Sequence, residues 1–135
     1  MYSWPDHFPE QCPPAHAVDL SGLAFRFINK RQAAEYDFTS YYERQPSGDW
    51  AGQECKARGL SVLRTYDDCV IMREAVPALR KKRLAIANVT AEVGLIAPTP
   101  SANCEGHCTW WRSVPMAIAM QHFSLLSEST EEAHV

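Results

Sequence analysis

The segment Cys104-Glu105-Gly106-His107-Cys108-Thr109-Trp110-Trp111 places two thiols, one imidazole and two indoles within eight residues. Side chains of these types bind metals, act as nucleophiles, carry protons or fill a protein core. Its last three residues favour extended structure, so we expect a strand over 109–111. The segment therefore combines a candidate functional site with a candidate core strand.

The two cysteines and the histidine suggest two kinds of thiol chemistry. Cys104, His107 and Cys108 are ligands that zinc accepts, but a structural zinc site needs four ligands and no second pair is present. We therefore expect no metal, with zinc as the alternative where the fold supplies a fourth ligand. Cysteine catalysis is disfavoured because neighbouring strand residues point to opposite faces, which separates His107 from Cys108.

A third interpretation uses the histidine without the thiols. In it a cleft brings together three catalytic candidates from different parts of the chain: Arg26, Ser61 and His107. The arginine would anchor an anion, the serine would supply a hydroxyl, and the histidine would hold the substrate by a hydrogen bond. Binding residues beside them would be Thr109, Trp110 and Trp111.

Length and composition predict one small cytoplasmic domain. The chain has 135 residues, of which 46% are hydrophobic and 21% charged, as in ordinary globular proteins. The net charge of −3 gives no reason to expect nucleic-acid binding. Neither a basic and apolar leader nor an apolar run of about 18 residues is present, so we expect no membrane association. In the cytosol the five cysteines would all be thiols.

The chain divides into an arm, a core and a tail. Residues 1–17 contain four prolines, which exclude a regular helix and predict an extended arm. Trp4 and Phe8 of this arm should pack on the domain, although a free arm that binds a partner is the alternative. Residues 18–126 form the core, and residues 127–135 form a frayed acidic tail.

Hydrophobic periodicity predicts an α+β domain with a mainly antiparallel sheet of four to six strands and two or three helices. Expected strands cover Leu23–Ile28, Leu60–Arg64, Leu84–Val89, Val93–Ala97 and Thr109–Trp111. Turn signals at 90–92 predict that the third and fourth strands form a hairpin. Expected helices begin after Asp37 and Thr65 as N-caps and within 114–127, and Pro77 should end the second helix near Ala75–Val76.

Arg26 is the exception within an otherwise apolar strand. An arginine on an open sheet face or at a sheet edge, where its charge prevents mispairing, is the favoured interpretation. The alternative is an anion-binding arginine inside a cleft. The two interpretations predict opposite degrees of burial for the guanidinium group.

Several motifs resemble those of a family of small bacterial proteins of uncharacterised activity. They are Trp4-Pro5, Phe8-Pro9, Cys12-Pro13-Pro14, Asp37-Phe38 with Ser40 and Glu43, Gly59-Leu60-Ser61-Val62, and His107 with Thr109-Trp110-Trp111. The order of Arg26, Ser61 and Glu92 is more loosely similar to ADP-ribosyltransferase-like folds. That resemblance implies a nucleotide- or NAD-acting enzyme, with NAD as the cofactor.

Two functions follow as hypotheses. The first is a bacterial binding module for a protein partner, with the proline-rich arm and the Trp110–Trp111 region as its surface and no cofactor. The second is an enzyme that acts on a small nucleotide-like ligand in a cleft formed by Arg26, Ser61 and His107. The enzyme requires Arg26 and His107 to meet in a concave pocket, whereas the module requires exposed aromatic side chains.

Overall fold

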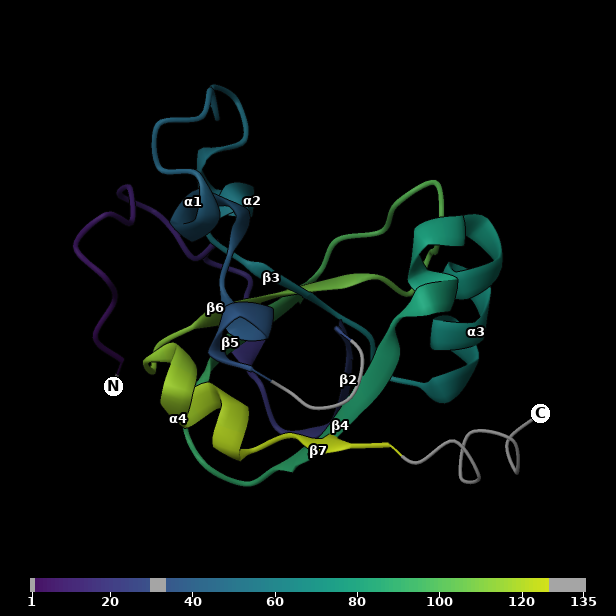
Figure 1. Ribbon diagram of the computed structural model, residues 1–135. Helices are drawn as coiled ribbons and strands as arrows, with labels where there is room; N and C mark the ends of the chain where they lie inside the picture. Colours follow the sequence, from purple (N-terminus) through teal and green to yellow (C-terminus); the bar gives the residue numbers. More distant parts are fainter. Residues whose placement is uncertain (1, 30–33, 127–135) are drawn as a thin grey trace.

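The computed structural model describes residues 2–29 and 34–126 of the chain (Figure 1). The predicted tail, 127–135, lies outside the described residues. Within the described residues, seven strands form two antiparallel sheets, which confirms the predicted α+β class. No described helix has the length and apolar character needed to cross a membrane.

The larger sheet contains the Cys/His segment. Its strand order is β1 (Val18–Asp19), β5 (Gly94–Pro98), β6 (Cys108–Arg112) and β3 (Leu60–Val62). All five residues of β6 are buried, because β3 and β5 pair with its two edges and the domain core and the arm cover its faces. The predicted strand over 109–111 is thus confirmed, one residue longer at each end.

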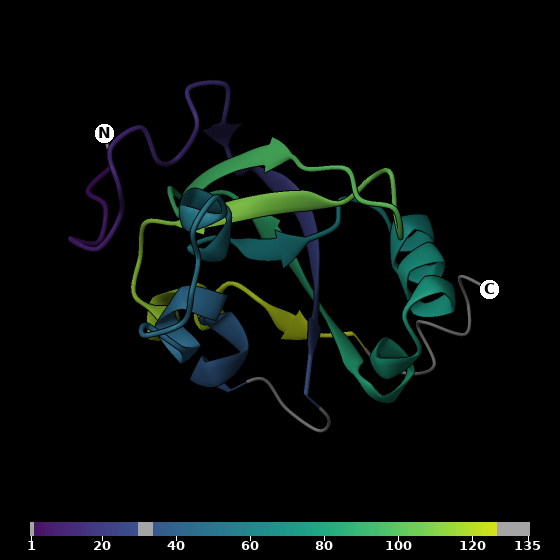
Figure 2. The ribbon, with the colours of Figure 1, turned by 90° about the horizontal axis from the view of Figure 1, so that it is seen from above.

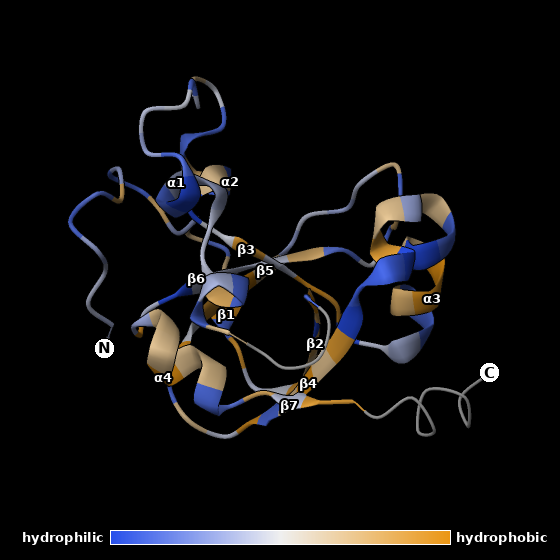
Figure 3. Cartoon of the chain, viewed as in Figure 1, coloured by the Kyte–Doolittle hydropathy of each residue, from blue (hydrophilic) through white to orange (hydrophobic). Residues whose placement is uncertain are grey.

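The smaller sheet has the order β2 (Gly22–Ile28), β4 (Arg83–Val89) and β7 (Ser124–Leu125). In Figure 2 its strands β2 and β4 run across the direction of β3, β5 and β6. Figure 3 shows apolar residues along β3, β4 and β7, whereas α1 is hydrophilic. The core between the sheets includes Trp110, which stacks on Phe123 at 5.8 Å between ring centroids.

Short helices connect the strands. They are a 3₁₀ turn η1 (Glu35–Phe38), α1 (Tyr41–Arg44), α2 (Glu54–Ala57), α3 (Tyr66–Ala75), a 3₁₀ turn η2 (Pro77–Lys81) and α4 (Met116–Gln121). Thr65 caps α3 by accepting a hydrogen bond from the Asp68 backbone N–H, as predicted. The α3 helix ends at Ala75, two residues before Pro77, which confirms the predicted helix end.

Two local predictions are wrong. Ser40, not Asp37, caps the helix that follows, because Ser40 and Glu43 form reciprocal hydrogen bonds at 3.2 and 2.8 Å. Residues 84–97 do not form a hairpin, because β4 pairs with β2 and β7 while β5 pairs with β1 and β6. The turn after β4 therefore carries the chain from one sheet to the other.

The proline-rich arm is attached to the domain. Cys12 forms a disulfide with Cys55 of α2, so the prediction of five thiols is wrong. Trp4 and Phe8 stack on each other at 5.6 Å and pack against a cluster that includes Trp111, which confirms that the arm packs. A chain segment without helix or strand is thereby held against the back of β6.

Candidate functional site

Two adjoining cavities open beside β3: residues of α1 and α2 line both, and α3 lines only the larger. In Figure 1 the α1–α2 segment and α3 lie on opposite sides of β3. The larger cavity has a volume of about 500 Å³ and the smaller about 320 Å³. Five residues line both cavities: Tyr41, Lys56, Gly59, Ser61 and His107. Arg26 lines the larger cavity, so the three predicted catalytic residues meet in one concave site.

Ser61 reaches the cavities because of strand alternation. In β3, Leu60 and Val62 are buried in the core, whereas Ser61 between them is exposed. Gly59, just before the strand, lies so close to β6 that an added Cβ would be 2.2 Å from Thr109 Cγ2. The glycine therefore permits the close approach that sets Ser61 beside the residues of β6.

His107 is fixed at both ring nitrogens. Its Nε2 lies 2.9 Å from Ser61 Oγ. Its Nδ1 lies 3.0 Å from the Thr99 carbonyl oxygen and 2.9 Å from Thr99 Oγ1, which in turn lies 2.7 Å from Thr109 Oγ1. A carbonyl oxygen only accepts, so Nδ1 carries the proton of the neutral ring and Nε2 accepts the Ser61 hydroxyl proton.

The surroundings of His107 favour its neutral form. Burial lowers the pKa of His107, and the Lys56 charge lowers it further, although the hydrogen bond to Thr99 partly opposes both. The imidazole is thus neutral at pH 7 and can accept a proton. This is the protonation state that a general base requires.

Arg26 is buried, which contradicts the favoured prediction of an open face or edge. Only 9% of the residue is exposed, and its Nε and Nη1 donate to the Asp37 and Ser61 carbonyl oxygens at 2.8 and 2.6 Å. Burial, with the nearby Arg44 charge, lowers the pKa of Arg26 to about 10, so it remains cationic at pH 7. The hydrogen bond to Ser61 also ties β2 to β3 at the cavity floor.

Positive charge dominates the larger cavity. It is lined by Arg26, Arg44, Lys56 and Lys82, against one carboxylate, that of Asp37. That carboxylate accepts hydrogen bonds from the backbone N–H groups of Asn29 and Ala34 at 3.0 and 2.9 Å. In the described part of the chain no carboxylate forms an ion pair with any of the four cations.

The three predicted binding residues are buried in β6. Trp110 is fully buried, Trp111 is 2% exposed, and Thr109 is 3% exposed. The indole N–H groups of Trp110 and Trp111 donate to the carbonyl oxygens of Val93 and Cys55. Neither indole is thus exposed for binding, because both faces of β6 are covered, whereas Thr109 lines the smaller cavity and bonds to Thr99.

The two thiols of the segment contact Asp68 and Gly106, and neither is hydrogen-bonded to the His107 ring in the described structure. Cys104 and Cys108 are buried, and burial raises the pKa of both thiols, which disfavours the reactive thiolate. Cys104 Sγ lies 3.7 Å from an Asp68 carboxylate oxygen. Over the described ranges no three residues of the types His, Cys, Asp and Glu are grouped to hold a metal, and the alternative zinc ligands are thus not brought together.

Sequence reasoning missed several residues of the site. Neither Thr99 nor Lys56 belongs to a recognisable sequence motif. Their importance is visible only in the fold, where Thr99 contacts His107 and Lys56 lines both cavities. The acidic position implied by the looser resemblance is not filled, because Glu92 lies in the turn before β5 and lines neither cavity. The local sequence signal for the site was Ser61, which lies in a predicted strand two residues after Gly59.

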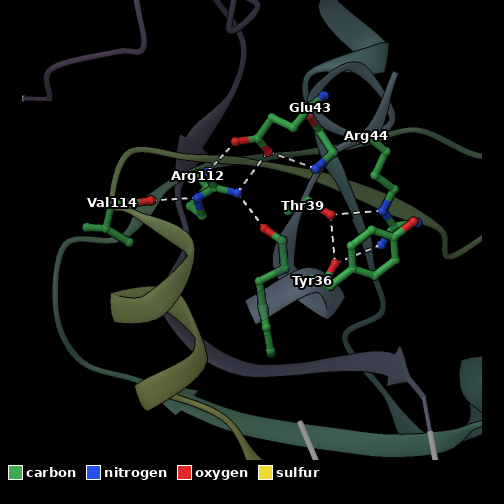
Figure 4. A network of polar contacts seen from close by, with 8 residues as sticks. Tyr36, Thr39, Glu43, Arg44, Arg112 and Val114 are labelled. Atoms are coloured by element: carbon green, nitrogen blue, oxygen red, sulfur yellow. Dashed lines mark hydrogen bonds and ion pairs between the residues drawn. The ribbon is translucent and has the colours of Figure 1, made fainter. Parts of the chain in front are cut away.

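The wall formed by α1 is held by the network in Figure 4. Arg112 of β6 forms an ion pair with Glu43 at 2.7 Å, and its guanidinium also donates to the carbonyl oxygens of Phe38 and Val114. Arg44 donates to Thr39 Oγ1 at 2.8 Å and lies over the Tyr36 ring. These contacts fix the position of α1, from which Tyr41 and Arg44 line the larger cavity.

Comparison with known proteins gives no relative: no family model, no curated protein and no solved structure matches the chain.

Proposed function

We propose that the adjoining cavities bind a small anionic ligand of the nucleotide class. The observation that carries the proposal is the burial of Arg26 at a cavity wall without an ion-pair partner among the described residues. A buried charge is costly unless it is paired and hydrogen-bonded. The Asp37 carboxylate favours the Arg26 cation through space but forms no ion pair with it, and a phosphate or carboxylate in the cavity supplies a direct partner.

The other cations support an anion of more than one charge. Arg44, Lys56 and Lys82 line the same cavity, although the whole chain has a net charge of −3. Clustered positive charge in a cleft raises the local concentration of anions and speeds their association. Arginine is especially suited to phosphate because its planar guanidinium donates two parallel hydrogen bonds.

Aromatic side chains at the cavity walls support a ligand with a flat ring. Tyr41, 62% exposed, lines both cavities, Tyr36 lines the larger, and Trp50 lines the smaller. Exposed aromatic faces stack on nucleobases and contribute about 1–3 kcal/mol per base. A nucleotide carries both an aromatic ring and an anionic group, so a single molecule can contact the aromatic side chains and the cations of the two cavities.

The resemblance to ADP-ribosyltransferase-like folds makes NAD the first nucleotide to test. Arg26 and Ser61 occupy adjacent strands in the cleft and share a hydrogen bond, in keeping with the order that the resemblance implies. The sequence contains neither a Ser-Thr-Ser nor a Glu-x-Glu motif. We therefore propose nucleotide binding and leave the transferase reaction out of the proposal.

Isothermal titration calorimetry with NAD, ADP-ribose, AMP and pyrophosphate tests the proposal. We expect saturable binding of at least one nucleotide, and Lys56→Ala should weaken it about tenfold or more. A hydrogen bond to a charged group contributes about 1.5–3 kcal/mol, which corresponds to that loss. Lys81→Ala is the matched control, because Lys81 has the same charge but lines neither cavity.

Two results would contradict the proposal. One is the absence of binding for all four compounds at low ionic strength, where electrostatic attraction is strongest. The other is equal weakening by Lys56→Ala and Lys81→Ala, which would indicate attraction to net charge and not to the site. Binding of pyrophosphate without binding of any nucleotide would support the anion site but contradict the proposed contact with a nucleobase.

The binding-module hypothesis is supported less well than ligand binding. Trp110 and Trp111 are buried, and the arm is bonded to α2 through Cys12 and Cys55. The same disulfide bears on location, since disulfides persist in oxidising compartments and are rare in the cytosol. We accordingly propose an oxidising compartment in place of the cytoplasmic location predicted from composition.

A further inference from the structure

We propose that Ser61 is a nucleophile activated by His107, and that the site cleaves carboxylic esters that carry a negative charge. Thr99 acts as the positioning residue that holds the histidine ring. The inference goes beyond ligand binding and does not rest on it, because it depends on three side chains whose mutual geometry is independent of any nucleotide.

The geometry contains three parts: a nucleophile, a general base and a group that orients the base. Ser61 Oγ lies 2.9 Å from His107 Nε2, within the range for proton transfer to a general base. The Thr99 carbonyl oxygen lies 3.0 Å from Nδ1 and fixes the tautomer that leaves Nε2 free to accept. A carbonyl oxygen thus takes the place that a carboxylate holds in a Ser-His-Asp triad.

A purely structural role explains this hydrogen bond less well. Ser61 is exposed and lines both cavities, so its hydroxyl could be satisfied by water without His107. Ser61 of β3 and His107, just before β6, line both cavities, and Thr99, which follows β5, contacts the His107 ring. Their convergence at the accessible surface of a cleft is the feature expected of a reaction site.

The charges around His107 keep it available as a base. The cations that line the cavities with it are Arg26, Arg44, Lys56 and Lys82, and the carboxylates are Asp37 and Asp49. Burial and Lys56 lower the pKa of His107. The neutral ring therefore predominates over the whole neutral pH range.

The reaction proceeds in two balanced steps. Ser61 Oγ attacks the ester carbonyl carbon while His107 Nε2 takes its proton, and the tetrahedral oxyanion collapses as the ester C–O bond breaks. The leaving alkoxide takes that proton from Nε2, which leaves an acyl-Ser61 intermediate. Water then attacks the acyl carbon with His107 as base, the Ser61 ester bond breaks, and Ser61 Oγ regains a proton.

Lys56 provides positive charge for the developing oxyanion. It lines both cavities together with Ser61 and His107, and it forms no ion pair within the described residues. A cation near the reacting carbonyl stabilises the negative charge that develops on its oxygen. The remaining cations of the larger cavity favour esters with a carboxylate or phosphate elsewhere in the molecule.

A fluorophosphonate reagent tests the nucleophile directly, because Ser Oγ displaces fluoride and forms a stable Ser–P bond. We expect intact-mass spectrometry to show one adduct and peptide mapping to place it on Ser61. Ser61→Ala should abolish the adduct, and His107→Gln should slow its formation at least a hundredfold. Ser47→Ala, at an exposed serine outside both cavities, should leave the rate unchanged.

The pH dependence separates a base from a structural partner. The labelling rate should rise with pH through a single midpoint below 6.5, and Lys56→Met should raise that midpoint. Circular dichroism of each variant establishes that it is folded. The proposal is overturned by an unlabelled Ser61, by an adduct on another residue, or by a rate that His107→Gln does not change; none of these results bears on nucleotide binding.

Discussion

At the scale of single residues, the Lys56–His107 pair shows how a cation tunes a base. Burial already lowers the pKa of His107, and the positive charge of Lys56 lowers it further, because a nearby cation disfavours the imidazolium form. His107 differs in this from a histidine beside a carboxylate, whose pKa rises. The site is therefore built to accept a proton near neutral pH.

NMR titration of His107 measures this effect. We expect a midpoint below the ordinary value of about 6.5, and a higher midpoint in Lys56→Met, since the repulsion is removed. Because the folded pKa is lowered, His107 contributes to stability fully above 6.5, and this contribution falls as pH drops toward the folded pKa. An unchanged midpoint in Lys56→Met, with Lys81→Met as control, would contradict the assignment.

Gly59 permits the chain before β3 to pack closely against β6. An added Cβ would lie 2.2 Å from Thr109 Cγ2 and 3.3 Å from Trp111 Nε1, so Gly59→Ala should lower the free energy of unfolding by about 1–3 kcal/mol. Thr109→Ser removes Cγ2 but keeps the hydroxyl that bonds to Thr99. Urea unfolding should show partial recovery in the double variant, and no recovery would place the clash elsewhere.

At the scale of elements, α1 is fixed to β6 by a partly buried ion pair. Burial of Glu43 alone would raise its pKa, but hydrogen bonds from Arg112 and Ser40 outweigh burial and lower the pKa of Glu43. A lowered carboxyl pKa adds stability above the unfolded value of about 4.3, and that stability is lost as pH falls through the folded pKa.

Glu43→Gln should therefore destabilise the protein by about 1.5–3 kcal/mol at pH 7. At acidic pH, below the lowered folded pKa of Glu43, the difference from the wild-type chain should shrink, because the wild-type carboxyl also becomes neutral. Chemical unfolding at both pH values measures the two differences. A destabilisation that does not depend on pH would show that Glu43 acts by packing alone.

The helices and strands also show which features of the fold can be predicted from the sequence. The β2 strand and the α3 helix were correctly predicted because each carries a local period, and Thr65 and Pro77 mark the helix ends. The hairpin over 84–97 failed because a short turn can join strands of different sheets as easily as neighbours in one sheet. Strand pairing depends on long-range packing, which no local period encodes.

At the scale of the whole molecule, the site exists because the fold brings distant residues together. Arg26, Ser61 and His107 line one cavity, as the enzyme hypothesis required, yet Arg26 was expected to be exposed and is buried. A lone cation in a strand is ordinarily solvated, so only the fold shows that β3 and η1 cover it and supply carbonyl acceptors. Thr99 and Lys56 became apparent for the same reason.

The disulfide joins the arm to α2, the helix that contributes Lys56 to both cavities. Cys12 and Cys55 are 43 residues apart, and Cys55 lies in α2 directly before Lys56. The bond stabilises the folded state mainly by restricting the unfolded chain, by about 2–4 kcal/mol for a loop of this kind. Arg58, which follows in the chain, donates to the His7 carbonyl oxygen at 2.9 Å and lies over the Tyr42 ring, so arm, α1 and α2 form one unit.

Replacing both bonded cysteines, Cys12→Ala with Cys55→Ala, should therefore lower the free energy of unfolding by about 2–4 kcal/mol in urea titrations. Treatment of the wild-type protein with reductant should give a similar loss, whereas the double variant should not respond to reductant. The double variant should also label more slowly at Ser61, since Lys56 sits beside the released bond. Equal stability with and without reductant, together with two additional titratable thiols in the denatured wild-type chain, would show that the bond does not form.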